Sequence, residues 1–496
     1  MTTTSDSIST AAGAGPPAAR SRWIMLAVLL AGQFMALLDV TIVNVAMPTI
    51  GRTLHASGAE LQLVVSGYTV SYAMLLITGA RLGDLRGRRR MFLFGVAAFT
   101  VSSAVCGFAP DIAVLIIARF VQGAGAAATM PQIMSVIQAR FTGATRARAL
   151  SAYSAVLASG FVAGQVLGGL LVNADLFGSQ WRPVFLVNVP IGLAVLALAA
   201  RVVPQDEPGG ARRIDVAGLA IAVPAVFAIV LPLMLGHQEH WPWWILACIA
   251  GGLVLAVAFV AVERRMAAHG GDPLLNLGVL RAPGLAPGLA AVGLLMITYG
   301  AFLFSLALQL QGGLGESALR AGLTFAPCAA AFGIGGFFWR RLPERIHHLL
   351  TPGGCLVAVA AYVAVGLDLA SGTRGGVQLQ AVLIVLGAAL ALGFSPLVTH
   401  SLVHVPLRDA ADASGLFTTT LQLGQAVGVA TFGSVFLTLA ARGGPHASAH
   451  ALATTQYWLA ALLALAAAAS LPLTRATSRA RAARLPSASP APPARR

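Results

Sequence analysis

The sequence carries little charge for its length. Asp, Glu, Lys and Arg make up 10% of its 496 residues, whereas soluble domains carry about 25%. Lysine is absent altogether, so every fixed positive charge on a side chain is an arginine. Hydrophobic residues account for 57% of the chain, and the mean hydropathy is +0.81. This amount of charge is too small to cover a chain of this size with a water-facing surface, which excludes an ordinary soluble protein.

Patterns of cysteine and metal ligands are also scarce. No CxxC pair occurs, and four cysteines fall within or at the edges of apolar segments, at Cys106, Cys248, Cys328 and Cys355. Buried small hydrophobes explain them better than disulfides or zinc. His400 and His404 have the i,i+4 spacing of metal ligands, but no acid or thiol accompanies them, which favours interfacial polar residues. We therefore expect no metal and no cofactor and, without a nucleophile–base pattern, no enzyme.

In place of charge, the chain has a series of long apolar segments. About 20 apolar residues in a helix cross the roughly 30 Å hydrocarbon core of a membrane. Such segments recur along the whole chain and predict an all-α polytopic membrane protein with about fourteen transmembrane helices. The expected spans are Trp23–Val45, Leu61–Leu82, Phe92–Ala109, Ile112–Gln138, Ala149–Val172, Val184–Ala200, Ile214–Met234, Trp243–Val262, Leu285–Leu310, Ala321–Phe338, Cys355–Ala370, Val377–Leu402, Ser414–Leu439 and Thr455–Leu473.

Arginines are distributed unevenly between the loops of this arrangement. With an even number of spans, both termini lie on one side of the membrane, together with every second loop. That side carries most of the arginines, including the Arg81–Arg90 cluster, whereas the opposite side carries only Arg52, Arg182, Arg320, Arg374 and Arg442. By the positive-inside rule, both termini are cytoplasmic and the protein is a multi-pass protein of the inner membrane. The net charge of +15 is then topological, and we expect no nucleic-acid partner.

Both ends of the chain read as unfolded cytoplasmic tails. Residues 1–22 are rich in small residues, and the span that follows them is too long for a cleaved signal peptide. Residues 475–496 are rich in Pro, Ser, Ala and Arg, a composition typical of a disordered tail.

The first span contains an acid, Asp39, in the stretch GQFMALLDVTIVNVAMP. Of the residues in this span, it costs the most free energy to bury in the membrane. On these boundaries Asp39 is the only acid deep inside a span, and Arg119 is the only deep base. At 1.5 Å per residue, Asp39 lies roughly 24 Å from the cytoplasmic end of its span and Arg119 about 12 Å from the outer end of its own. In a core of about 30 Å these depths overlap, so the two side chains are compatible with a pair.

A charge near the middle of a membrane costs about 2.5–3.5 kcal/mol, which makes an intramembrane ionisable residue a functional candidate. Burial and a neighbouring guanidinium act in opposite directions on the proton affinity of a carboxylate. A conformational change that alters either of them can therefore load or release a proton. We expect Asp39 and Arg119 to couple proton entry to transport; the alternative is a permanent structural ion pair.

Two apolar segments carry stripes of glycine. In SGFVAGQVLGGLL, Gly160, Gly164 and Gly168 repeat every four residues and are followed by Gly169, and a late segment repeats the device with Gly424 and Gly428. Small residues at this spacing let another helix backbone approach closely. Stripes in corresponding positions of two halves indicate an internal repeat, which is common in transporters. Static tight packing would explain the glycines as well.

The expected loop after the second span combines an acid with several arginines. It reads GARLGDLRGRRRMFLFG, in which Asp84 precedes a tight turn at Gly87 and then Arg88, Arg89 and Arg90. Anchoring of the topology explains the arginines but neither the acid nor the glycine. A carboxylate among guanidiniums forms charge-assisted pairs, which predicts a lock on the cytoplasmic face.

This loop resembles the G-x-L-x-D-x-x-G-R-[KR] signature of the major facilitator superfamily. The stretch LDVTIVNVAMP resembles the first-span signature of its drug:proton antiporter branch with fourteen spans. The stretch ARFVQGAGAAATMP is similar to the fourth-span R-x-x-Q-G-x-G signature through Arg119, Gln122, Gly123 and Gly125. The stretches WRPVFLVNVPIG and ASGLFTTTLQLGQAVGVA resemble further parts of that branch.

The resemblance implies the major facilitator fold: a six-helix bundle at 23–201, two inserted helices with linkers at 202–282, and a second six-helix bundle at 283–474. The chain departs from the loop signature at Ala80 and Leu85. It also has Gln165 where the G-P-x-x-G-G signature of exporters has proline. Proline breaks a backbone hydrogen bond and bends a helix, which glutamine does not do, so this departure weakens the inference of efflux.

Aromatic, sulfur-containing and amide side chains on the span faces form a candidate substrate cavity without a ring of charges. These residues are Met35, Tyr68, Tyr72, Met130, Tyr299, Phe302, Gln309, Gln422 and Gln425. Met and aromatic surfaces suit bulky lipophilic molecules, although ordinary helix packing would explain each residue equally well.

Three hypotheses for the function remain at this point. The first is a proton-coupled exporter of drugs or of a lipophilic antibiotic, the second a proton-coupled carrier of a specific metabolite, and the third a non-transporting membrane sensor. The presence of Asp39 disfavours the sensor hypothesis, because a sensor has no need of an intramembrane titratable site. We expect a monomer whose partners are a small lipophilic substrate, protons and the lipid bilayer.

We predict that Asp84→Asn reduces transport while membrane insertion stays intact, because the neutral amide cannot form the charge-assisted pairs of the expected lock. The measurement compares substrate accumulation in cells with the amount of protein in the membrane fraction. An Asp84→Asn variant that transports normally would show that this segment is only a topological anchor.

Overall fold

The computed structural model describes residues 19–205, 216–235, 241–269, 271, 273, 277–370, 376–403, 405, 410–443 and 446–482. Within these residues the chain forms helices and no strand, which confirms the expected all-α fold for this part of the chain. Most of the two expected tails, residues 1–18 and 483–496, lies outside the described residues.

The helices follow the order of the expected spans. The first half contains α1 (Ala19–Thr53), α2 (Gly58–Arg86), α3 (Arg88–Gly107), α4 (Ile112–Arg140), α5 (Gly143–Ala174), α6 (Pro183–Leu186) and α7 (Asn188–Val202). The two middle helices are α8 (Val216–Leu235) and α9 (Trp243–Ala268). The second half contains α10 (Leu285–Leu308), α11 (Ala318–Phe338), α12 (His347–Ala370), α13 (Val377–Leu402), α14 (Ala410–Gly428), α15 (Ser434–Ala441) and α16 (Ala447–Ala482). Two short π-helical segments, Gln309–Gly313 and Val429–Gly433, follow α10 and α14.

Local sequence signals explain where several helices begin. At the start of α2, the Glu60 N–H donates to the Ser57 hydroxyl at 3.3 Å, and the Ser57 N–H donates to the Glu60 carboxylate at 2.7 Å. These two bonds form a capping box, which satisfies two otherwise unpaired N–H groups. At the start of α4, Asp111 accepts from the Val114 N–H at 2.9 Å. Both helices therefore begin at residues whose side chains replace the missing backbone acceptors.

Several helices are longer than the expected spans. Helix α1 begins at Ala19, and α16 continues to Ala482, so the ends of both expected tails next to the membrane are helical. Alanine and arginine are strong helix formers, and nothing in the sequence of α16 after Pro472 breaks the helix at the membrane boundary. Helix α12 begins at His347, so His347 and His348 lie in its first turn.

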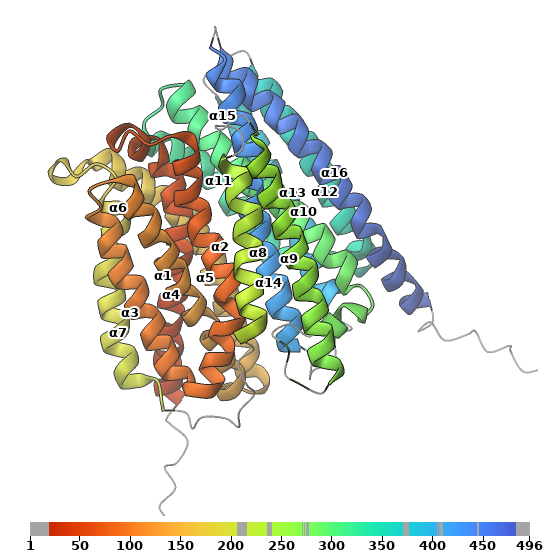
Figure 1. The fold of residues 1–496 in the computed structure, drawn as a ribbon. Helices are drawn as coiled ribbons and strands as arrows, with labels where there is room; N and C mark the ends of the chain where they lie inside the picture. Colours follow the sequence, from red (N-terminus) through yellow and green to blue (C-terminus); the bar gives the residue numbers. More distant parts are fainter. Residues whose placement is uncertain are drawn as a thin grey trace, which may run out of the picture.

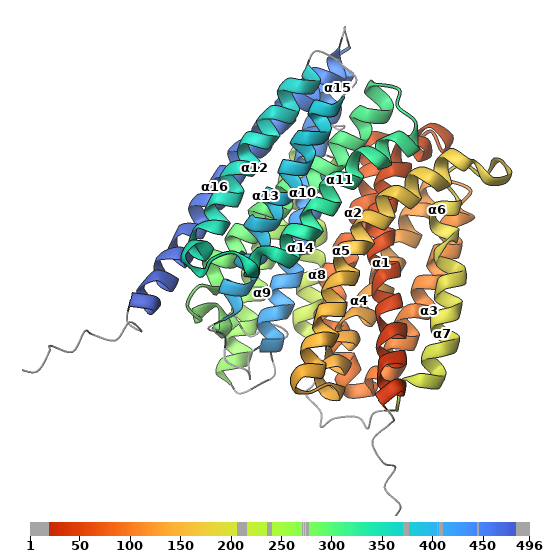
Figure 2. The ribbon, with the colours of Figure 1, turned by 180° about the vertical axis from the view of Figure 1, so that it is seen from behind.

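The two halves of the chain lie side by side, with α8 and α9 running along their junction (Figures 1 and 2). In the first half, α4 packs against α2 and α3, and α1 packs against α5 and α7. In the second half, α12 packs against α13 and α16, and α10 packs against α14 and α16. Helices α8 and α9 pack mainly against each other, and α8 also contacts α2. The inserted pair is therefore a hairpin beside the two halves.

The glycine stripes occupy equivalent places in the two halves. An ideal Cβ at Gly160 would lie 2.9 Å from Leu37 Cβ, and one at Gly168 would lie 2.9 Å from the Ile42 carbonyl oxygen, both in α1. In the second half, an ideal Cβ at Gly428 would lie 2.1 Å from the Ile297 carbonyl oxygen of α10, and one at Gly424 would lie 2.9 Å from that of Gly293. Each stripe thus lets a helix press against the first helix of its own half, as an internal repeat requires.

Among the described residues, eleven helices are long and apolar enough to cross a membrane. Two shorter apolar helical segments, Ala163–Ala174 and Ala217–Leu233, accompany them. Each of the fourteen expected ranges overlaps a helix, but this criterion supports eleven spans rather than fourteen. Large apolar side chains face outward on several of these helices, such as Trp243 with 80% and Val257 with 70% of its surface exposed. Such exposed apolar surface is suited to contact with lipid.

The two halves are joined near the end of the molecule where α1 ends and α2 begins, the upper end in Figure 1. Gln62 of α2 and Ser434 of α15 are hydrogen-bonded at 3.1 Å. Gln311, in the π segment after α10, donates to the Val45 carbonyl oxygen at 2.8 Å. An ideal Cβ at Gly169 would lie 2.7 Å from the Ala318 carbonyl oxygen at the start of α11. Toward the opposite end, α16 slopes away from the first half in both views.

Gly164 provides the tightest contact of its stripe. An ideal Cβ there would lie 1.8 Å from Thr41 Oγ1 and 2.8 Å from the Leu38 carbonyl oxygen. We predict that Gly164→Leu abolishes transport at normal expression, because α1 and α5 cannot keep this separation. The matched control is Gly251→Leu, since an ideal Cβ at Gly251 of α9 meets nothing within 4 Å. Full activity of Gly164→Leu in the same transport assay would contradict the prediction.

Candidate functional site

Asp39 of α1 and Arg119 of α4 form an ion pair in the interior of the first half. The Arg119 Nη1 donates to Asp39 Oδ2. Both residues are buried, with 0% and 1% of their surface exposed. The structure thus brings together the two deep charges whose depths overlapped in the sequence.

Arg119 is held from three sides. Its Nε donates to the Val64 carbonyl oxygen of α2 at 2.9 Å, and its Nη1 also donates to Gln122 Oε1 at 2.7 Å. The guanidinium lies 4.6 Å from the centre of the Tyr68 ring and 5.8 Å from that of Phe185. A guanidinium over an aromatic face gains cation–π energy, which is larger when the site is dry. The position and orientation of the positive charge are therefore set by α2, α4 and α6 together.

Asp39 accepts two hydrogen bonds from amides besides the bond from Arg119. Gln122 Nε2 and Asn188 Nδ2 each donate to Asp39 Oδ1 at 2.9 Å. Gln122 Nε2 also donates to the Ser103 hydroxyl of α3 at 2.6 Å. Isolated charges are strongly disfavoured in an apolar interior unless they are paired and hydrogen-bonded. This network meets that requirement with side chains from α1, α3, α4 and α7.

Asn188 is a site residue that the sequence reasoning missed. It lies in the stretch WRPVFLVNVPIG, which carries part of the resemblance to the antiporter branch. It is the first residue of α7, directly after the break between α6 and α7, and is fully buried. The available signal was an amide within an apolar segment, which requires a polar partner once it is buried.

The residues of the fourth-span motif have two different roles: one is a polar partner of Asp39, and two are glycines at helix contacts. Gln122 belongs to the network around Asp39. An ideal Cβ at Gly123 would lie 2.3 Å from the Tyr68 carbonyl oxygen of α2, and one at Gly125 would lie 2.7 Å from the Phe99 nitrogen of α3. The two glycines therefore let α4 lie against α2 and α3, which brings Arg119 within reach of α2.

The expected cytoplasmic loop is reduced to a single residue. Helix α2 continues through Asp84 to Arg86, and α3 begins at Arg88, so only Gly87 separates them. Gly87 has a φ of +94°, a backbone conformation that favours glycine. Arg89 donates to the Ala200 carbonyl oxygen near the end of α7. The side chain of Asp84 lies outside what the structure describes.

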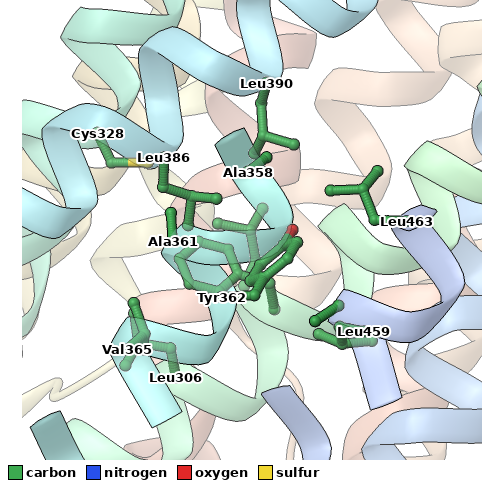
Figure 3. Close-up of a cluster of buried hydrophobic side chains, with 14 of the residues drawn as sticks. Leu306, Cys328, Ala358, Ala361, Tyr362, Val365, Leu386, Leu390, Leu459 and Leu463 are labelled. Carbon is green, nitrogen blue, oxygen red and sulfur yellow. The ribbon is translucent and has the colours of Figure 1, made fainter. Parts of the chain in front are cut away.

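The structure does not gather the nine candidate cavity residues into one cavity. Met35, Tyr68 and Met130 belong to a buried core of the first half, against which Tyr72 packs. Phe302 belongs to the core of the second half, with its ring centre 5.6 Å from that of Tyr362. Figure 3 shows Tyr362 surrounded by apolar residues of α10, α11, α13 and α16. In this structure these residues pack within the cores of the two halves.

The remaining candidates lie in α10, in the π segment that follows it and in α14. Gln309 is the buried first residue of the π segment. Gln422 and Gln425 are half-buried in α14. Gln425 Nε2 donates to the sulfur of Met296 at 3.8 Å. Tyr299 lines a small cavity between the halves. Helices of both halves thus meet at a surface that contains part of the expected set.

This inter-half cavity has a volume of about 10 Å³, roughly the space for one water molecule. Its described lining carries no charge and consists of Thr41, Gln165, Tyr299, Leu303, Phe325, Cys328, Ala329, Phe332, Gly387 and Leu390. Gln165, which replaces the proline of the exporter signature, is 2% exposed. Its Oε1 has no hydrogen-bond partner in the described structure. An unpaired buried carbonyl is costly, so it is suited to a hydrogen bond from a ligand.

The described residues contain no group of three or more His, Cys, Asp or Glu side chains that could hold a metal ion. The ring of His400 is 6.3 Å from that of Trp339, and His404 lies outside the described residues. Cys106, Cys328 and Cys355 are buried, and Cys248 faces outward.

The fold and the buried ion pair are those of a helical membrane protein with a charged site inside one half. Residues 29–429 match the family model of the Major Facilitator Superfamily. The match covers most of the chain, and the chain belongs to this superfamily of transporters. Together with its many apolar helices, this makes it an integral membrane protein.

Two curated relatives and one solved structure illustrate the relationship. The chain is 36% identical over 430 residues to a probable actinorhodin transporter of Streptomyces coelicolor, which covers 86% of this chain and 74% of the relative. It is 37% identical over 420 residues to the cephamycin export protein CmcT of Amycolatopsis lactamdurans, which covers 83% of each. A bacterial homologue of the human lysosomal transporter Spinster, solved in an inward-facing and unoccupied conformation, superimposes with a TM-score of 0.68 at 19% identity, over 94% of this chain and 99% of that one. That likeness concerns the fold alone.

We predict that Arg119→Leu lowers the free energy of unfolding by about 3–5 kcal/mol, because it leaves the buried carboxylate of Asp39 unpaired. The double variant Asp39→Asn/Arg119→Leu should recover most of this loss, since both charges are removed. Thermal unfolding of the detergent-purified protein measures the effect.

The control for this prediction is Arg320→Leu. Arg320 pairs with Glu316 at 2.9 Å, but its side chain is 61% exposed, and such pairs contribute about 0–1 kcal/mol. If Arg119→Leu destabilises the protein no more than Arg320→Leu, the buried pair does not hold this half together.

Proposed function

We propose that the protein is a proton-coupled efflux transporter that exports drugs or a lipophilic antibiotic across the cytoplasmic membrane and confers resistance to them. Membership of the Major Facilitator Superfamily supports a transporter. The names of the relatives, a probable actinorhodin transporter and a cephamycin export protein, support export of antibiotics. The fourteen apolar segments of the sequence support fourteen spans, and the arginine distribution supports an orientation with both termini in the cytoplasm.

The buried pair of Asp39 and Arg119 is the main observation in support of proton coupling. A carboxylate with 0% exposure is retained in a membrane protein at a substantial cost, which favours a functional role. In this proposal Asp39 takes up a proton when the network opens to the outside and releases it when Arg119 pairs with it again. Each proton that enters supplies about 2.3 kcal/mol per 100 mV of membrane potential.

The contacts between the halves support alternating access. With the termini in the cytoplasm, the contacts of Gln62 with Ser434 and of Gln311 with Val45 lie at the outer end. The structure then represents a conformation that is closed to the outside. Outward opening must break these contacts, and the π segments beside them are irregular helix turns of a kind that often occurs at functional sites.

Helix α1 links the proton site to the junction of the halves. Asp39 lies within the first half, whereas Thr41 of the same helix turn lines the inter-half cavity. Thr41 Oγ1 is also the atom that an ideal Cβ at Gly164 of α5 would lie nearest to, at 1.8 Å. A small shift of α1 on protonation would therefore change the contacts at the cavity without any intermediate element.

The chemistry of the inter-half cavity favours a lipophilic substrate. Its described lining contains the aromatic residues Tyr299, Phe325 and Phe332 and carries no charge. A charged metabolite would have to leave water without a partner of opposite charge, which is unfavourable. The carrier of a specific metabolite remains the alternative and requires the opposite coupling if it imports.

Inside-out membrane vesicles test this function. With an acidic lumen, vesicles that contain the protein should accumulate a fluorescent lipophilic dye or a lipophilic antibiotic, and a protonophore should abolish the accumulation. Asp39→Asn should reduce uptake to the level of vesicles without the protein, because the amide keeps the shape but cannot carry a proton. Asp111→Asn is the matched control, since asparagine caps a helix as well as aspartate does.

The outcomes separate the three hypotheses. If vesicles with the Asp39→Asn variant still take up substrate against its concentration gradient under the same proton gradient, Asp39 is not the proton-coupling residue. Protein-dependent uptake of a metabolite, or its release from preloaded vesicles, without transport of any drug or dye would favour the specific carrier. A full panel of drugs and metabolites without any protein-dependent uptake or release would favour a sensor.

A further inference from the structure

We propose that Asn188 is a positioning residue that serves both charge states of Asp39. It donates a hydrogen bond to the carboxylate through Nδ2 and, after rotation of its amide, accepts one from the protonated acid through Oδ1. This inference rests on the proposed role of Asp39 as a proton carrier.

A protonated Asp39 needs an acceptor where the carboxylate needed donors. Protonation forms one O–H bond on a carboxylate oxygen and removes the negative charge, and no other covalent bond changes. The new O–H group is a donor, whereas an ionised carboxylate only accepts. In a buried site without an acceptor, this donor would be left unsatisfied, which is costly.

Arg119 cannot provide that acceptor, and Gln122 is poorly suited to it. Arginine has only donors. Gln122 Oε1 accepts from Arg119 Nη1 at 2.7 Å, and its Nε2 donates to both Asp39 Oδ1 at 2.9 Å and the Ser103 hydroxyl at 2.6 Å. Rotating this amide would bring its NH₂ group against the donors of Arg119. The orientation of Gln122 is therefore locked.

Asn188, unlike Gln122, is free to rotate its amide because only one hydrogen bond of this amide holds it in the described structure. Its Nδ2 donates to Asp39 Oδ1 at 2.9 Å, while its Oδ1 is buried and has no hydrogen-bond partner in the described structure. The carboxylate only accepts, so the amide must present its NH₂ group to Asp39. A half-turn of the amide gives up this one bond and brings Oδ1 to the same place. The resting structure thus holds a vacant acceptor next to the oxygen that takes the proton.

Three titratable groups on neighbouring helices interact electrostatically with Asp39, and among these three only Arg119 is hydrogen-bonded to it in the described structure. They are the Arg119 guanidinium of α4, the Tyr68 phenol of α2 and the Cys106 thiol of α3. Helix α6 contains no titratable residue, and the sequence of α5 contains none between Tyr153 and Asp175. In α7 the first titratable residue is Arg201, near the far end of the helix. Asn188 is therefore the polar contact that α7 makes with the carboxylate.

Infrared difference spectra of the purified protein between low and high pH test this inference. A carboxylic acid band that is lost in Asp39→Asn identifies the protonated Asp39. We expect Asn188→Leu, which keeps the volume of the side chain, to shift this band to higher frequency, because the acid loses its acceptor. The matched control is Asn44→Leu. The buried Asn44 donates to the Val40 carbonyl oxygen of its own helix at 3.2 Å, so this substitution should leave the Asp39 band unshifted.

A second measurement needs no substitution at Asn188. In wild-type protein labelled with ¹³C at the asparagine side-chain carbonyl, one amide band should move with the protonation of Asp39, and Asp39→Asn should abolish that movement. If the Asp39 band is present but neither changes in Asn188→Leu nor accompanies a shift of a labelled band, this inference is wrong while Asp39 remains a proton carrier. If no pH-dependent band depends on Asp39, the proposed proton coupling itself fails.

Discussion

The burial of one carboxylate and one guanidinium constrains most of the first half of this protein. Two charges inside an apolar bundle are tolerated only when they are paired with each other and hydrogen-bonded by their surroundings. Asp39 therefore accepts hydrogen bonds from amides of α4 and α7. Arg119 donates to a backbone carbonyl of α2 and packs against the aromatic ring of Tyr68. The glycines of α4 are a consequence of the same demand, because α2 and α3 must come close for these bonds to form.

In the described residues, the second half repeats the helix packing of the first without a buried ion pair like that of Asp39 and Arg119. Both halves press a glycine-striped helix against their first helix, through Gly164 in one and Gly428 in the other. The core of the second half is filled by apolar and aromatic residues around Tyr362. The charge site and the junction of the halves are therefore separate places that share α1. In the proposed mechanism this division would let the first half respond to protons, while the described lining of the cavity between the halves, which carries no charge, is suited to lipophilic molecules.

The network is also asymmetric around the carboxylate. Arg119 and Gln122 are held by several partners each, whereas Asn188 makes one bond and keeps its carbonyl oxygen vacant. A site made only of fixed donors would stabilise a single charge state and resist protonation. One adaptable amide beside several rigid groups is a simple way to let a buried acid exist in two states.

The sequence by itself determined the class of the protein, the helices and the two deep charges, because apolar length, arginine distribution and the cost of buried charge are local properties that residues carry along the chain. It also indicated the glycine stripes, whose spacing is that of one helix face. Only the tertiary structure decided the partners. Asn188 lies 149 positions from Asp39, and Phe302 proved to be core while Gln165 lines the cavity. Spacing within a helix predicts which side chains share a face, but the contact between two faces depends on how the helices pack, which no single segment encodes.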